Sequence, residues 1–211
     1  AAAALAKKLS LKRLIVPREN AAEAAALPEI EAYACESLAD VLAVLRKLKD
    51  PPSLSIDKSE AARNDIDLSQ VRGQALARRA LEIAAAGGHN LLLVGTPGSG
   101  KTMLARCLPT ILPPLSPDEQ SEVTTVYSAA GLTLRQQGLR RRRPFRAPHH
   151  SASAVGLVGG GHPIRPGEIS LAHRGVLFLD EMAALPRRVL ETLRQPLEDR
   201  TVGITRARQS V

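Results

Sequence analysis

The sequence contains few aromatic residues and few cysteines. It has no tryptophan, two phenylalanines, two tyrosines and two cysteines in 211 residues. So few aromatic rings argue against a single-strand nucleic-acid binder that stacks bases on its side chains. Cys35 and Cys107 lie far apart in the sequence, so neither a disulfide framework nor a zinc ribbon is expected. This cysteine usage fits a reducing compartment.

The sequence also lacks a long apolar run. No stretch approaches the ~18 apolar residues that a helix needs to cross a bilayer. The alanine-rich start, with Lys7 and Lys8, does not have the order of a signal peptide. We therefore expect a cytoplasmic protein without a membrane partner.

Acidic residues are outnumbered by basic ones. The chain has 29 Lys and Arg against 21 Asp and Glu, a formal net charge of +8. The basic excess is concentrated in residues 135–146 and 200–208. Such clusters favour a polyanionic partner. The alternative is a solubilising surface, or charge that neutralises nucleotide phosphates.

The chain is predicted to consist of two parts joined by a linker. In residues 1–49, an alanine-rich helix leads to a short strand at 14–16, and a later helix begins after Ser37, which forms a capping-box pattern. These few elements cannot close a core, so we expect the end of a larger domain and a chain that is a fragment. Residues 50–69 are polar and contain two prolines, which is typical of a linker. Residues 70–211 form the second part.

Helical spacing and end signals predict the elements of this second part. Apolar residues from 70 to 86 recur at helical spacing, and Gly87-Gly88 follow as a stop signal. Ser116, followed by a proline and two acids, predicts the start of another helix. Pro196 is expected to end or kink a helix over 186–199. Strands are predicted at 91–94, within "PFRAPHH" and at 176–180, and a helix is predicted at 100–108.

A glycine-rich loop follows the predicted strand at 91–94. It fits GxxxxGK[ST] at every fixed position and opens a helix, which is the context that this motif requires. Its glycines let backbone N–H groups turn towards phosphate oxygens, and the helix N-terminus adds partial positive charge. Lys101 is placed to reach the β- and γ-phosphates, and the Thr102 hydroxyl to ligate Mg²⁺. The loop therefore predicts ATP and Mg²⁺ as ligands, and it comprises Gly95, Thr96, Pro97, Gly98, Ser99, Gly100, Lys101 and Thr102.

A second acidic motif, "VLFLDE", lies downstream. Residues 176–179 form an apolar run typical of a strand buried on both faces, and Asp180 and Glu181 emerge at its carboxyl end, where parallel sheets bind ligands. Asp180 is predicted to hold Mg²⁺ through water, and Glu181 to polarise the attacking water. With Lys101 they form the predicted catalytic set. The fold class is α/β, a parallel sheet flanked by helices.

Two stretches resemble a known family. "VRGQALARRALEIAAAGGHNLLLVGTPGSGKTMLA" and "RPGEISLAHRGVLFLDEMAAL" are similar to the AAA+ ATPases of the magnesium chelatase subgroup, and "FRAPHHSASAVGLVGGG" resembles its bacterial ComM (YifB) branch. The resemblance covers nearly all of residues 66–211. It implies a P-loop AAA+ core in which Val71, Gly73 and Gln74 lie near the adenine, and Met103 completes the expected nucleotide-binding set.

The resemblance also implies a function. Members of this family are ring-forming motors, usually homo-hexamers, in which a neighbouring subunit completes the ATP site. ComM-like proteins are implicated in DNA branch migration during natural transformation, whereas magnesium chelatase motors drive Mg²⁺ insertion into protoporphyrin. We therefore expect an ATPase that remodels DNA. The alternatives are a chelatase motor that acts with a porphyrin-binding partner, a nucleotide-binding fragment without turnover, and a Lon-type protease.

The N-terminal piece resembles the end of a Lon-protease-like domain. "LKRLIVPREN" and "SLADVLAVLRKL" carry this likeness. The Ser and Lys that serve proteolysis in Lon would precede residue 1, so no protease activity is expected from these residues. The family's sensor residue, arginine finger and helical lid would follow Val211. We expect ATP binding with poor turnover from this stretch alone.

Several basic and histidine residues are further candidates. "EDRTVGITRARQSV" resembles the hairpin that follows the acidic motif in this family, and Arg206 and Arg208 share one strand face, so both are candidates for contact with a DNA backbone. Plain surface charge is the alternative. His149 and His150, on a strand, are expected to point to opposite faces and not to share a metal.

Overall fold

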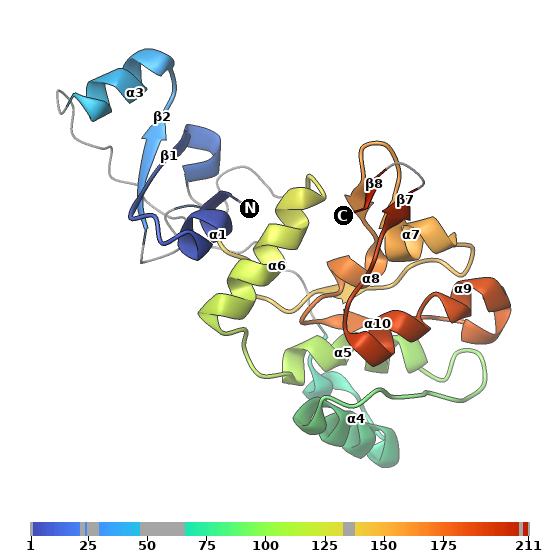
Figure 1. The fold of residues 1–211 in the computed structure, drawn as a ribbon. Helices are drawn as coiled ribbons and strands as arrows, with labels where there is room; N and C mark the ends of the chain where they lie inside the picture. The colour runs from blue at the N-terminus through green and yellow to red at the C-terminus, as the bar shows by residue number, and fades with distance from the viewer. Residues whose placement is uncertain are drawn as a thin grey trace. The chain divides into compact units, whose positions relative to one another are not determined.

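The computed structural model describes residues 2–21, 24, 30–46, 66–132, 138–206 and 209–210 (Figure 1). The chain divides into two compact units, one formed by Ala1–Ala62 with Ser116–Arg141 and the other by Arg63–Leu115 with Arg142–Val211. Both combine helices with strands, and the class is α/β, as predicted. The domain boundaries drawn from the sequence stay a prediction.

The N-terminal part of the first unit is a small parallel pair of strands with short helices. Helix α1 (Ala2–Lys8) precedes β1 (Arg13–Pro17), which contains the strand predicted at 14–16. After the 3₁₀ turn η1 (Arg18–Asn20), β2 (Glu31–Cys35) pairs with β1 in parallel, so that Ile15 lies opposite Tyr33. The core here is built mainly from alanines, with Val16 and Ile30. Such small side chains bury little apolar area.

Two helices of this unit begin with a capping box, which was predicted at Ser37, whereas Ser116 was predicted only as a helix start. Helix α3 (Leu38–Leu45) begins after Ser37, whose hydroxyl accepts the N–H of Asp40. Helix α6 (Pro117–Ala129) begins after Ser116, which is paired in the same way with Glu119. These caps are predictable because the signal lies within four consecutive residues. Three leucines of α3, Leu38, Leu42 and Leu45, are exposed in the described structure.

Helix α6 also supports the basic segment that follows it. The Arg140 guanidinium lies 3.8 Å from the ring centroid of Tyr127, a cation–π contact. The Arg140 backbone N–H donates to the hydroxyl of the buried Thr124 at 2.9 Å. Arg140 thus has a structural role in its own unit.

In the second unit, two helices lie side by side around a compact apolar core (Figure 1). The 3₁₀ turn η2 (Leu68–Gln70) precedes α4 (Ala75–Gly87), and α5 is Lys101–Ile111. The helix predicted from residue 70 begins at residue 75, because Gly73 and Gln74 have left-handed backbones, with φ of 69° and 50°. Gly88, also left-handed, ends α4 as predicted. The buried residues of this core are Leu68, Val71, Leu81, Leu104 and Cys107.

The strand predicted at 91–94 is not part of a sheet. Leu93 packs against the core of α4 and α5, whereas Leu92 and Val94 are 71% and 87% exposed. This alternation is that of an extended segment with one face covered. Among the described residues no strand pairs with it, so the prediction of a strand at 91–94 was wrong. A strand is completed by partner strands, which local sequence does not supply.

The strand predicted at 176–180 is shorter than expected. β6 (Val176–Leu177) pairs in parallel with β3 (Phe145–Arg146), the strand predicted within "PFRAPHH". Residue 178 continues the ladder through its N–H, which donates to the Arg146 carbonyl at 2.8 Å, and the rings of Phe145 and Phe178 stack with centroids 6.1 Å apart. The strand is half-buried because it has one partner strand within the described ranges.

Short elements surround this strand pair. The glycine-rich stretch forms the antiparallel pair β4 (Gly159–Gly160) and β5 (Arg165–Pro166). Pro196 falls in the first turn of α10, where a missing N–H costs no helical bond. The helix predicted over 186–199 is therefore interrupted at residues 192–193, between α9 and α10, and not at the proline. The remaining elements are α7 (Ala154–Val158), α8 (Glu168–Leu171), η3 (Met182–Ala184), α9 (Arg187–Glu191) and α10 (Arg194–Asp199).

The C-terminal hairpin is described in part. β7 (Thr205–Arg206) and β8 (Gln209–Ser210) pair antiparallel. The side chain of Arg206 and all of Arg208 lie outside the described residues. None of the helices in the described part of the chain has the length and apolarity needed to cross a membrane.

Candidate functional site

The glycine-rich loop lies directly before α5. Gly100 caps the helix with φ of 85°, and Gly98 has φ of 76°, two backbone conformations that side-chain-bearing residues rarely adopt. The Lys101 ammonium folds over the loop and donates to the carbonyls of Gly95 at 2.9 Å and Thr96 at 2.8 Å. The predicted residues from 95 to 102 thus form a loop and the first residues of α5, and a helix N-terminus is a place suited to anions.

The turn at residues 73 and 74 contacts this loop. Gln74 donates from Nε2 to the Ser99 carbonyl oxygen at 2.6 Å. Val71, expected near the adenine with them, is 2% exposed and belongs to the apolar core, and its place near the adenine stays a prediction. Met103 is partly exposed on α5. The structure therefore brings Gln74 to the loop and places Val71 beneath it as packing.

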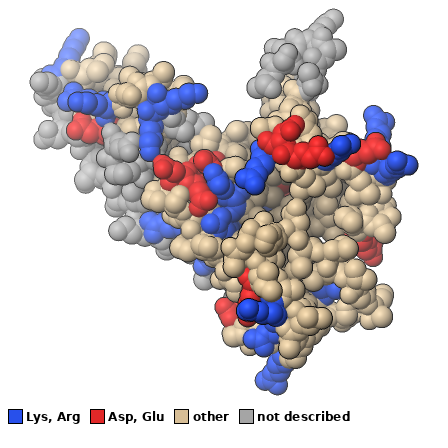
Figure 2. All heavy atoms as spheres, turned by 60° about the horizontal axis from the view of Figure 1, so that its bottom comes forward, with Lys and Arg blue, Asp and Glu red and all other residues tan. Residues whose placement is uncertain are grey.

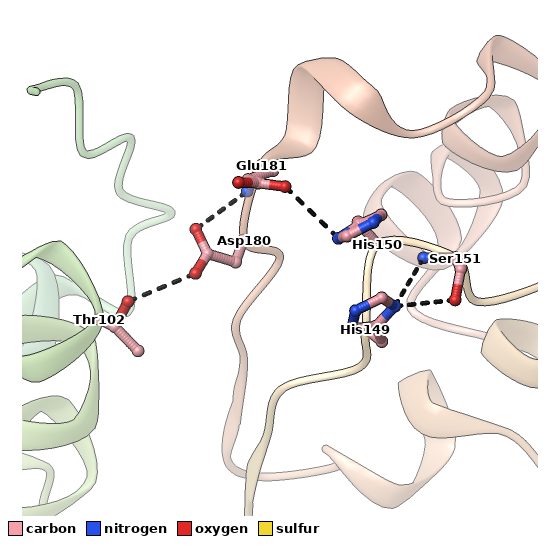
Figure 3. Close-up of polar contacts among 6 residues, drawn as sticks. All are labelled: Thr102, His149, His150, Ser151, Asp180 and Glu181. Carbon is pink, nitrogen blue, oxygen red and sulfur yellow. Dashed lines mark hydrogen bonds and ion pairs between the residues drawn. The ribbon is translucent and has the colours of Figure 1, made fainter. Parts of the chain in front are cut away.

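One of the two acidic residues, Asp180, contacts the end of the loop at Thr102. The Thr102 hydroxyl donates to Asp180 Oδ2 at 3.3 Å, although 78 residues separate them (Figure 3). The other Asp180 oxygen, Oδ1, accepts the N–H of Glu181 at 3.0 Å. An exposed hydroxyl and an exposed carboxylate side by side are oxygen donors of the type that Mg²⁺ prefers. These two residues fit a magnesium ion that keeps several of its waters.

Glu181 has a strained backbone and turns towards a histidine. Its φ is 49°, in the left-handed region that a non-glycine residue enters at a cost, and such strain is typical of functional positions. Its carboxylate extends away from Thr102 and lies 3.4 Å from His150 Nδ1 (Figure 3). This contact was missed by the sequence reasoning, because no local pattern relates residues 150 and 181.

The two adjacent histidines lie together. The prediction that they point to opposite faces was wrong, because they follow β3 and are not part of it. The ring centroids of His149 and His150 are 4.0 Å apart, and His149 Nδ1 contacts the Ser151 hydroxyl at 2.8 Å. In the part of the chain that the structure describes, no three His, Cys, Asp or Glu side chains gather in a way that would hold a metal.

A bidentate ion pair supports the strands that carry these residues. Arg146, on β3, donates from Nε and Nη2 to the two carboxylate oxygens of Glu168, on α8, each at 2.6 Å. Both side chains are partly buried, at 31% and 24% exposure. The pair ties α8 to β3, whose partner strand leads to Asp180.

Two titratable groups lie near the other end of α5. Burial raises the pKa of the Cys107 thiol, and the charge of Asp67 adds to this effect. The Ser69 hydroxyl and backbone N–H hold the pKa of the Asp67 carboxyl below its usual range. Cys107 is completely buried in the core, so we assign it to packing and not to chemistry.

Comparison with known proteins agrees with this arrangement. Residues 67–211 match the family described as "Magnesium chelatase, subunit ChlI". The chain belongs to the magnesium chelatase family. This is the AAA+ family that the two sequence motifs indicated.

This magnesium chelatase family member is similar to several bacterial proteins. The chain is 45% identical to the competence protein ComM of Haemophilus influenzae, over 99% of this chain and 42% of ComM. It is 44% identical to YifB of Salmonella typhimurium, over 95% of this chain and 39% of YifB. A third relative, YifB of Escherichia coli, is 52% identical over 145 residues, 69% of this chain and 28% of that protein. The chain thus spans about two fifths of the length of the first two relatives.

Among solved structures, the chain is similar to NtrX of Brucella abortus in complex with ADP. The identity is 17%, the TM-score is 0.45, and the match covers 99% of this chain and 43% of that one. A likeness this low carries no argument about the site.

Proposed function

We propose that the loop at residues 95–102, with Asp180 and Glu181, is the ATP-binding and ATP-hydrolysing site of a ComM-like AAA+ motor. The observation that carries the proposal is the contact of Thr102 with Asp180, which joins the phosphate-binding loop to the acidic motif at 3.3 Å. Family membership supports the same assignment.

Each residue has a distinct role in this proposal. Thr102 and Asp180 would hold Mg²⁺, Asp180 through water, and the bound ion would neutralise phosphate charge. Lys101 would exchange the carbonyls of Gly95 and Thr96 for phosphate oxygens, a change that its flexible side chain permits.

Glu181 would act on the water that attacks the terminal phosphate. Its carboxylate is an acceptor and would take a proton from that water as the phosphate bond breaks. To do so it has to turn away from His150, which it contacts in this structure. That contact is between partly exposed side chains, so its loss costs little free energy.

Nucleotide binding tests the loop assignment. Lys101→Ala should weaken binding of Mg²⁺-ATP by about tenfold or more, because it removes charge-assisted hydrogen bonds to phosphate. The matched control is Arg106→Ala, which removes a positive charge from the exposed face of the same helix. Equal affinities of the two variants for Mg²⁺-ATP would contradict the proposal.

The substrate of the motor is proposed to be DNA, and its assembly a homo-hexamer. The identity to ComM, named as a competence protein, supports a role on DNA. On the face drawn in Figure 2, Lys and Arg side chains alternate with Asp and Glu. Two arginines of α9 and α10 pair with glutamates one turn on, in Arg187–Glu191 and Arg194–Glu198. We therefore assign DNA contact to the C-terminal hairpin with Arg206 and Arg208, and not to these helices.

A salt series separates DNA from the alternative partner, a porphyrin-chelatase complex. DNA-stimulated ATPase activity of the full-length protein should fall steeply as salt rises, because phosphate contacts release counterions. Replacing Arg206 and Arg208 together should reduce that salt dependence. Stimulation by a porphyrin-binding partner and not by DNA would indicate a chelatase motor. The Lon-like origin of residues 1–49 stays a prediction.

A further inference from the structure

The side chain of Gln74 forms a bridge between two segments of the nucleotide site. Its Nε2 donates to the Ser99 carbonyl at 2.6 Å, across 25 residues of sequence. Both segments are anchored in one core, because Val71 and Leu104 are each 2% exposed and belong to the same apolar cluster. The bridge therefore joins two firmly placed turns.

The backbone around Gln74 is strained in a way that serves this bridge. Gly73 and Gln74 are consecutive left-handed residues, with φ of 69° and 50°. For glutamine this conformation is unfavourable, and it persists only where the surroundings hold it. The turn delays the start of α4 to Ala75 and brings the Gln74 amide to the loop.

The bridge fixes one peptide plane of the glycine-rich loop. A trans peptide is planar, with its C=O and N–H pointing in opposite directions. A Ser99 carbonyl held by Gln74 therefore directs the Gly100 N–H to the other side. The same bond keeps a carbonyl oxygen, which would repel phosphate, turned towards Gln74. Gly100 itself has φ of 85°, a left-handed conformation that glycine adopts without a steric cost.

We infer that Gln74 is a positioning residue for phosphate binding: it holds the Ser99 carbonyl and so aims the Gly100 N–H at the phosphates. The inference rests on the proposed function of the loop. The family resemblance implies that Gln74 contacts the adenine base. The role inferred here is different, because Gln74 acts on the phosphates through the loop, and this effect does not depend on the base.

Two substitutions remove the donor in different ways. Gln74→Met keeps a side chain of similar length. Gln74→Gly removes the side chain and relieves the left-handed strain. A loss of phosphate affinity common to both variants therefore cannot come from misfolding. Arg72→Ala, a change at an exposed neighbour, is the control. The probes are Mg²⁺-ATP and Mg²⁺-tripolyphosphate, which lacks a base, each competing with a fluorescent ADP analogue on the full-length protein.

Both Gln74 variants are expected to bind tripolyphosphate and ATP about two- to tenfold more weakly, by the same factor for each probe, because one neutral hydrogen bond is lost. Weakened ATP binding with unchanged tripolyphosphate binding would overturn the inference in favour of a base contact. Unchanged binding of both probes would overturn it as well. If the unaltered protein binds neither probe, the proposed function itself fails, and this inference fails with it.

Discussion

Replacing Leu81 by alanine tests the core that carries the nucleotide site. Leu81, on α4, is 0% exposed and belongs to the apolar cluster that also contains Leu104 and Cys107 of α5. Leucine-to-alanine changes at fully buried sites cost about 2.7–5 kcal/mol, the sum of lost transfer free energy and a residual cavity. The matched control is Leu76→Ala on the same helix, where the side chain is 87% exposed and the expected change is within about 0.5 kcal/mol.

The assay has to report on this unit alone. Both tyrosines, Tyr33 and Tyr127, belong to the other unit, and the chain has no tryptophan, so intrinsic fluorescence does not follow α4 and α5. Hydrogen exchange of peptides that cover 75–87 and 101–111 follows these two helices directly. Leu81→Ala should speed exchange in both helices by about a hundredfold or more, since each 1.4 kcal/mol is a factor of ten. Equal exchange in the Leu81 and Leu76 variants would refute the packing described here.

Other expectations concern the residues around the site. His150→Ala should raise the basal kcat for ATP by about two- to fivefold with KM unchanged, because a weak contact that holds Glu181 aside is lost; an altered KM with constant kcat would contradict this. Glu168→Gln breaks a partly buried ion pair and should destabilise the strand pair by about 1–3 kcal/mol. The exposed control Glu198→Gln should cost less than about 1 kcal/mol, and both changes are measured by hydrogen exchange of residues in β3 and β6. Because burial raises the pKa of the Cys107 thiol, its thiolate fraction stays low as the pH rises. Alkylation of Cys107, mapped by mass spectrometry, should therefore be slower than in the unfolded chain at every pH from 7 to 9. Equal alkylation rates would show that the thiol is accessible.

Local signals in the sequence predicted much of this structure. The helix starts at Ser37 and Ser116 and the helix end at Gly88 were predicted, because each is decided by a few adjacent residues. The glycine-rich loop opening α5 is a local pattern of the same kind.

Long-range pairing was harder to predict. The run at 91–94 is apolar enough for a buried strand, yet strand pairing depends on residues elsewhere in the chain, and only Leu93 is covered. The contact of His150 with Glu181 and the hydrogen bond from Gln74 to Ser99 join segments whose approach is set by the tertiary fold. The apolar spacing predicted a helix from residue 70, but the left-handed turn at Gln74 delays the start of α4 to Ala75.

The most direct test of the central claim is the Mg²⁺-dependent ATPase rate of the full-length protein with Glu181→Gln. The amide keeps the size of the side chain and cannot accept the proton of the attacking water. The account predicts that Mg²⁺-ATP binding is retained while the hydrolysis rate falls by about a hundredfold or more. A Glu181→Gln protein that hydrolyses ATP at the full rate would contradict the assignment of this site.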